Sequence, residues 1–116
     1  MVEKRGAYVP RCGDAVWLTF DPQVGHEQAG RRPALVLSST DYNRTIGLAV
    51  VCPITSRVKG YPFEVAVPDG LRVGGVVLAD QVKSVDWQGR EAKFICQLPK
   101  SVVIESIAKM SSLLGG

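Results

Sequence analysis

The sequence lacks the long apolar runs of a membrane protein. Nowhere in its 116 residues does an apolar run approach the roughly 20 residues needed to cross a bilayer. The N-terminal residues 1–6 carry charges, and no apolar segment typical of a secretory signal follows them. These two absences predict a cytoplasmic protein.

Histidine and cysteine are scarce. His26 is the only histidine, which excludes a mechanism that needs two, such as that of a ribonuclease with a histidine pair. The three cysteines, Cys12, Cys52 and Cys96, are widely spaced, and no CxxC pair or Cys/His cluster occurs. The sequence therefore predicts neither a zinc site nor a disulfide framework. The GxGxxG, GxxxxGKS/T, HExxH and GxSxG motifs are also missing.

Composition and charge indicate one globular domain. Apolar residues make up 46% of the chain, too many for a disordered protein. There are no repeats, low-complexity tracts or linkers, so we expect a single domain over residues 1–116. The net charge of +3 is too small to establish a nucleic-acid partner by itself. Four cations fall at predicted strand ends or loops, where they would form one basic patch: Arg31, Arg32, Arg57 and Lys59.

Hydrophobic patterning predicts five or six short strands and one clear helix. The strands are expected over residues 13–20, 33–39, 47–55, 61–67, 76–87 and 92–97, and a short helical turn over 40–44. Pro53 suggests an edge position or a bend in its strand. Asp80 shares an apolar face with Val76 and Leu78, so its carboxylate must be paired, at a bulge or functional.

The helix is expected over residues 99–114. Its apolar face is predicted from the spacing of Val103, Ile107, Met110 and Leu114. Strands followed by a helix, without alternation of the two, argue against a parallel α/β sheet. They favour a mainly β fold, a small, curved, mostly antiparallel barrel closed by a C-terminal α-helix.

One stretch, residues 25–38, combines polar and apolar halves. Its first half carries His26, Glu27, Arg31 and Arg32 between glycines, and its second half reads as a buried strand. Ionisable groups held at the edge of a rigid strand are typical of binding and catalytic sites. An exposed hairpin loop with solvated charges is the alternative.

Several blocks of the sequence resemble the MazF/PemK (Kid) family of toxin endoribonucleases. They run in order along the chain: residues 13–17 (GDAVW), 20–22 (FDP), 25–30 (GHEQAG), 32–38 (RPALVLS), 53–55 (PIT), 59–63 (KGYPF) and 78–85 (LADQVKSV). A single Glu-Gln or Arg-Pro pair would mean nothing, whereas collinear blocks are specific. The resemblance implies an SH3-like barrel and a homodimer that cuts single-stranded RNA without a metal ion or cofactor. It also implies neutralisation by an antitoxin whose acidic tail covers the RNA site.

The resemblance assigns site residues as well. It maps the family's catalytic arginine onto Arg32 and its catalytic threonine onto Thr55, with Glu27 beside them. The residues expected to contact RNA are His26, Gln28, Arg31, Arg57, Lys59, Asp80 and Gln81. The segment 68–74 varies among relatives, so the recognised RNA sequence stays open.

Metal-free RNA cleavage uses the ribose 2′-OH as nucleophile and leaves a 2′,3′-cyclic phosphate and a 5′-OH. A guanidinium suits the developing phosphorane charge, which favours Arg32 for stabilisation. Thr55 would add a hydroxyl donor, as in an oxyanion hole. The proton carrier stays open between Glu27, the chemically easier base, and His26. An ordinary strand-end hydroxyl at Thr55, and a buried structural pair at Asp80 and Gln81, are the structural alternatives.

Two other functions fit a small barrel of this kind. A CcdB-like toxin would bind a protein target such as DNA gyrase without catalysis, but the Arg32 and Thr55 pair belongs to the ribonuclease branch. An SH3-like peptide-binding module would need clustered exposed aromatics. Most of the few aromatics here fall at predicted core positions.

Overall fold

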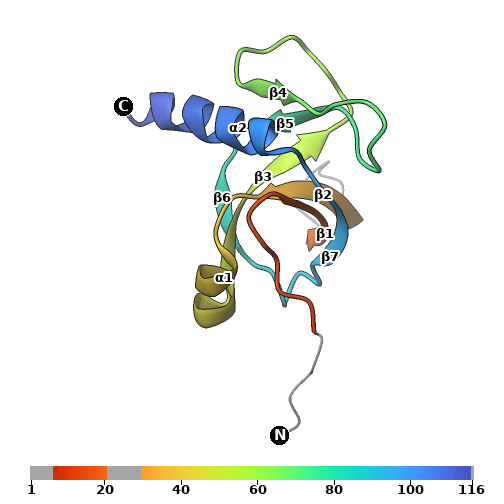
Figure 1. The fold of residues 1–116 in the computed structure, drawn as a ribbon, viewed down its shortest axis with the longest axis vertical. Coiled ribbons are helices and arrows are strands. Elements are labelled where there is room, and N and C mark those ends of the chain that lie inside the picture. Colours follow the sequence, from red (N-terminus) through yellow and green to blue (C-terminus); the bar gives the residue numbers. More distant parts are fainter. Residues whose placement is uncertain (1–6, 21–29, 116) are drawn as a thin grey trace, which may run out of the picture.

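A computed structural model describes residues 7–20 and 30–115, which form seven strands and two helices (Figure 1). In chain order these are β1 (Asp14–Phe20), β2 (Gly30–Val36), α1 (Thr40–Ile46), β3 (Leu48–Thr55), β4 (Glu64–Ala66), β5 (Val76–Leu78), β6 (Lys83–Asp86), β7 (Lys93–Gln97) and α2 (Lys100–Leu113). Within the described part of the chain, no helix is long and apolar enough to cross a membrane.

The strands form one antiparallel sheet in the order β4-β5-β3-β2-β1-β7, with β6 also paired to β3. The predicted class, mainly β and antiparallel with a C-terminal helix, is confirmed. The sheet is not closed into a barrel, because among the described strands β4 and β7 end the order and do not pair.

Strand β3 lies inside the sheet, which excludes the edge position, one of the two alternatives predicted for Pro53. On one side β3 pairs with β2 through residues 51–53. On its other side it pairs first with β6, through 48–51, and then with β5, through 54–55. Pro53 lies between these two paired segments, where the loss of one backbone donor is tolerated.

The exchange of partners along β3 also corrects the predicted long strand over 76–87. That segment forms two short strands, β5 and β6, which pair with different ends of β3. The turn between them holds Asp80 and Gln81, where Gln81 N donates to the Leu78 carbonyl at 3.1 Å. Asp80 therefore lies in a turn and not on the face of a continuous strand.

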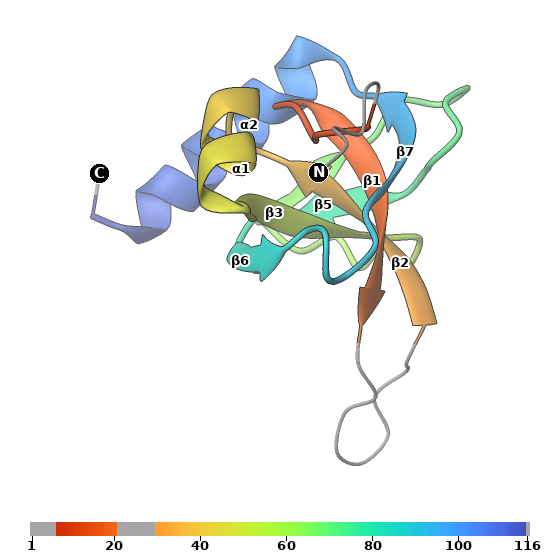
Figure 2. The same cartoon turned by 90° about the horizontal axis from the view of Figure 1, so that it is seen from below.

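Two apolar clusters fill the two sides of the sheet. One includes Leu35, Ile54, Val65 and Val77, and the other includes Val16, Leu18, Ala34, Val36 and Val51. Helix α2 contributes Val102 and Val103 to the first cluster. Its predicted apolar face is only partly right, because Leu114 is 78% exposed and Ile107 37%. The second half of α2 extends past the sheet in both views (Figures 1 and 2).

Two fully buried polar residues anchor the segments that flank β1. The Asp14 carboxylate accepts from the Tyr8 hydroxyl and from Gln97 Nε2, and burial together with Asp14 raises the pKa of Tyr8. Asn43 in α1 donates to the Pro10 carbonyl at 2.9 Å and accepts from the Ser38 hydroxyl at 2.6 Å. These bonds tie the N-terminal segment, the start of β1 and α1 to one another.

Gly75 directly precedes β5, and its backbone lies against the backbone at the end of β3. Its φ of +101° is left-handed. A Cβ added there would collide with the Thr55 carbonyl oxygen and lie 2.8 Å from Ser56 Cα. Only glycine fits this approach, and the approach fixes the backbone of Thr55.

We expect Asn43→Ala to lower the free energy of unfolding by about 2 kcal/mol, because the Pro10 carbonyl and the Ser38 hydroxyl would lose their hydrogen bonds to the Asn43 side chain. Chemical denaturation followed by circular dichroism measures this. The control is Thr45→Ala, an exposed residue of the same helix, which should stay within about 0.5 kcal/mol of wild type. Equal stabilities for the two variants would contradict the anchoring role of Asn43.

We expect Gly75→Ala to destabilise the protein by about 1–3 kcal/mol, because of the strained φ and the collision with the backbone of β3. Gly74→Ala is the matched control, since a Cβ at Gly74 meets nothing within 4 Å. Thermal unfolding of the two variants decides the point. A Gly75→Ala protein as stable as Gly74→Ala would show that the close approach is not a constraint.

Candidate active site

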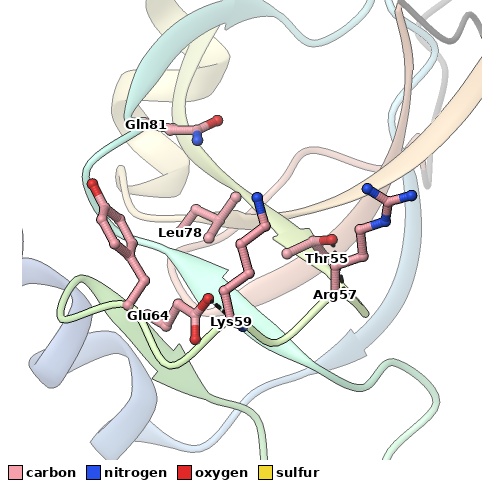
Figure 3. A pocket seen from close by; sticks show the side chains of 7 residues that line it. Thr55, Arg57, Lys59, Glu64, Leu78 and Gln81 are labelled. Carbon is pink, nitrogen blue, oxygen red and sulfur yellow. Dashed lines mark hydrogen bonds between the residues drawn. The ribbon is translucent and has the colours of Figure 1, made fainter.

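A pocket of about 250 Å³ opens where β3, β4 and β5 meet the loops that follow them. Figure 3 shows the side chains that line it. They are Thr55, Arg57, Lys59, Tyr61, Glu64, Leu78 and Gln81. Four of these, Thr55, Arg57, Lys59 and Gln81, are residues that the sequence predicted for the site.

The strand register explains why these side chains share one side. Thr55 lies opposite Val76 on β5, and Leu78 lies opposite Glu64 on β4. Because paired residues in an antiparallel sheet point to the same face, Thr55, Leu78 and Glu64 project together. Leu78 forms an apolar part of the wall between polar groups.

The Thr55 hydroxyl is oriented by the chain that follows it. Arg57 N donates to Thr55 Oγ1 at 3.1 Å. With one lone pair of the oxygen engaged, the hydroxyl hydrogen is available to a further acceptor. Thr55 is only partly buried, so such an acceptor can approach from the pocket.

Glu64 shapes the loop that carries Lys59. Its carboxylate accepts from the backbone amides of Lys59 at 3.0 Å and Gly60 at 3.1 Å. Lys109 of α2 donates to the Glu64 carbonyl oxygen at 2.9 Å, which ties the helix to β4. The Glu64 carboxylate is thus engaged by the backbone of this loop. The Lys59 ammonium projects into the pocket in Figure 3, where it can bind an anion.

Asp80 does not line the pocket itself, and it contacts the pocket residue Tyr61. The Tyr61 hydroxyl donates to Asp80 Oδ2 at 2.6 Å. This hydrogen bond, more than desolvation, raises the pKa of Tyr61 above its ordinary value.

Arg32 and Arg31 project to opposite sides of β2 because successive strand residues alternate. The pairing of β2 with β3 ends at Ala34 and Pro53, so it does not reach Arg32 and Thr55. Arg32 is not among the residues that line the pocket. Arg32 is half-buried. Arg31 instead donates to Thr19 Oγ1 at 2.6 Å and to the Arg90 carbonyl at 3.3 Å, and lies 4.0 Å from Glu91.

Three of the predicted site residues, His26, Glu27 and Gln28, lie outside the described residues. The predicted basic patch is divided: Arg57 and Lys59 line the pocket, whereas the guanidinium of Arg31 is engaged at the base of the β1–β2 pair. Within residues 7–20 and 30–115, no three His, Cys, Asp or Glu side chains gather as a metal site would require.

The sequence argument missed Tyr61, Glu64 and Leu78 as pocket residues. Tyr61 and Leu78 lie inside blocks that carry the family resemblance, but strand patterning gave them no function. Glu64 lies outside those blocks, and only the pairing of β4 with β5 reveals that its side of the strand faces the pocket.

Comparison with known proteins gives a consistent result. Residues 11–113 match the family of PemK-like, MazF-like toxins of type II toxin–antitoxin systems. The endoribonuclease toxin MazF of Escherichia coli is 53% identical over 85 residues, which cover 73% of this chain and 76% of that protein. The E. coli endoribonuclease PemK is 36% identical over 106 residues, covering 85% and 78%.

Solved structures point to the same family. A crystal structure of MazE-MazF (Form-II) from Deinococcus radiodurans superposes with a TM-score of 0.89 at 56% identity, covering 94% of this chain and 98% of that one. MazF (Form-I) from the same organism gives 0.87 at 55%, covering 95% and 100%. The chain therefore belongs to the family of PemK-like, MazF-like toxins of type II toxin–antitoxin systems.

Proposed function

We infer that the protein is an endoribonuclease toxin that cuts single-stranded messenger RNA at specific sequences and so inhibits translation and growth. The observation that carries this inference is the pocket, where the Thr55 hydroxyl lies together with the cations of Arg57 and Lys59. The relatives named MazF and PemK are endoribonucleases. We place the reaction in the bacterial cytoplasm, where messenger RNA is translated.

The chemistry follows from the charges of these groups. The ribose 2′-OH gives up its proton to a base and attacks the adjacent phosphorus, which forms a phosphorane with additional negative charge. Expulsion of the 5′ oxygen, which takes up a proton, leaves the 2′,3′-cyclic phosphate and a 5′-OH. The guanidinium of Arg32 would donate to the phosphorane oxygens, and the free hydroxyl hydrogen of Thr55 would add a third donor. Arg57 and Lys59 would hold the flanking phosphates. This arrangement requires no metal ion, and a chelator should not slow it.

We propose two protein partners. The solved relative MazE-MazF is a toxin–antitoxin pair, and a cognate antitoxin with an acidic segment would complement the cations of the pocket. The second partner is another copy of the chain. Ile104 and Ile107 of α2, and Leu114 directly after it, are exposed, and apolar side chains of this kind would be covered in an interface between two copies.

A CcdB-like toxin that acts on gyrase without catalysis is not favoured. The relatives matched by sequence are endoribonucleases, and the pocket keeps the hydroxyl and cations that RNA cleavage needs.

We expect Arg32→Ala to lower the single-turnover rate of RNA cleavage by about 10²–10³-fold or more, because a transition-state donor is lost. Thr55→Val should lose a smaller factor, and Thr55→Ser should retain most of the activity since it keeps the hydroxyl. Cleavage ends mapped on a mixed RNA pool, with and without a chelator, provide the measurement.

Arg44→Ala serves as the control, because Arg44 is an exposed arginine of α1 that pairs only with Asp41 among the contacts described. It should cut at the wild-type rate. Sedimentation should show a dimer for all variants. An Arg32→Ala protein that still cuts RNA at the wild-type rate would refute the catalytic role of Arg32. Equal activities of Thr55→Val and Thr55→Ser would refute the role of the Thr55 hydroxyl.

The proton carrier has its own test, and we propose Glu27. A general base works only when deprotonated, so the rate should fall as pH drops through its pKa, near 4–5 for a carboxylate and near 6.5 for His26. Glu27→Gln should remove this acidic limb and slow cleavage by about 10²–10⁴-fold. If His26→Gln removes the limb and Glu27→Gln leaves it, the base is His26.

A further inference from the structure

The side chain of Tyr61 is held at its hydroxyl and at its ring, and it remains accessible. It is 44% exposed and lines the pocket. Its hydroxyl donates to Asp80 Oδ2 at 2.6 Å, and its ring packs against Phe63 with centroids 5.9 Å apart. These two contacts hold the ring in one orientation at the edge of the pocket.

The hold on Tyr61 comes from two links between separate loops. Ala79 N donates to the Phe63 carbonyl at 3.0 Å, and the Tyr61–Asp80 bond adds a side-chain link beside it. The other oxygen of Asp80, Oδ1, is buried and finds no hydrogen-bond partner among the described residues. The phenol is thus the group that orients this carboxylate, and the carboxylate orients the phenol.

Tyr61 is unsuited to acid–base chemistry in this position. Its hydrogen bond to Asp80 raises the pKa of the phenol, and its single O–H is already committed to the carboxylate. What the side chain offers to a ligand is the face of its ring.

The pocket has two chemically distinct ends. In Figure 3 Arg57 and Thr55 lie on one side, Gln81 lies on the other, and Leu78 lies between them. Tyr61 belongs to the Gln81 end, because its hydroxyl binds the preceding residue, Asp80. The cationic end suits a phosphate, whereas an aromatic face beside an amide suits a base of single-stranded RNA. At about 250 Å³ the pocket is smaller than the clefts that take drug-sized ligands.

We propose that Tyr61 stacks on one nucleobase of the RNA and that Asp80 is the positioning residue that holds the ring for it. This inference rests on the proposed function, because it names the part of the substrate that the pocket recognises. It makes Tyr61 a determinant of where the RNA lies relative to Thr55 and Arg32.

The decisive experiment removes the base and the ring separately. A short RNA containing the mapped cleavage site is made with one abasic nucleotide at each position in turn. Binding is measured by fluorescence anisotropy in an Arg32→Ala background, so that the RNA stays intact. Removing the stacked base should weaken binding by about 5- to 150-fold when Tyr61 is present. In Tyr61→Leu the same abasic change should cost almost nothing further.

Two more variants separate stacking from positioning. Tyr61→Phe keeps the ring and loses the bond to Asp80, so binding of the intact RNA should weaken several-fold while the base at that position still contributes. Asp80→Ala should match it, and the double variant should lose no more than either single change. If Asp80 were only structural, Asp80→Ala would weaken every RNA of the series equally, and the positioning role would be refuted.

Tyr42→Leu is the matched control, since Tyr42 is a comparably exposed tyrosine (39%) on α1 and does not line the pocket. It should bind the whole abasic series like the Arg32→Ala parent. Circular dichroism melting checks that each variant is folded.

The proposal would be overturned if the Tyr61→Leu protein lost affinity equally for every RNA of the abasic series, so that no single base depended on Tyr61. Failure of the proposed function would appear separately, as wild-type protein that leaves every RNA of the mixed pool intact.

Discussion

The close approach of Gly75 to the end of β3 sets the geometry on which the pocket depends. β3 exchanges β6 for β5 near Pro53, and this exchange turns its last residues toward the short β4–β5 pair. The chain entering β5 must then pass against the Thr55 carbonyl, where a side chain has no room. Thr55, Leu78 and Glu64 come to one face as a result, and the site follows from the packing of the backbone.

The loops around the pocket are fixed by polar contacts and not by apolar burial. Glu64 holds the Lys59 loop through two backbone amides, and Asp80 holds Tyr61 through its hydroxyl. Such contacts preorganise donors before substrate arrives, which reduces the free energy lost in ordering the site on binding. They also keep acidic groups engaged with protein donors, so that the cations of the pocket remain available to phosphate.

Helix α2 joins the pocket to a surface suited to another protein. Its first half buries Val102 and Val103 on the sheet, and Lys109 contacts the backbone of Glu64. Its second half extends past the sheet with Ile107 and Leu114 exposed. A protein that packs on this half of α2 would therefore contact the same helix that Lys109 links to the backbone of Glu64.

The sequence by itself determined the class of the fold and the position of the C-terminal helix. Alternation and apolar runs located most strands. Collinear blocks identified the family and contain three residues that line the pocket, Thr55, Lys59 and Gln81, and the expected basic patch added Arg57. Only tertiary structure decided that Pro53 lies in a central strand, that residues 76–87 form two strands, and that the sheet stays open. Strand partners depend on contacts distant in sequence, which local periodicity does not encode. The same reason hid Tyr61 and Glu64, because their place in the pocket is set by the pairing of β4 with β5 and by a bond to Asp80 across nineteen positions of the chain.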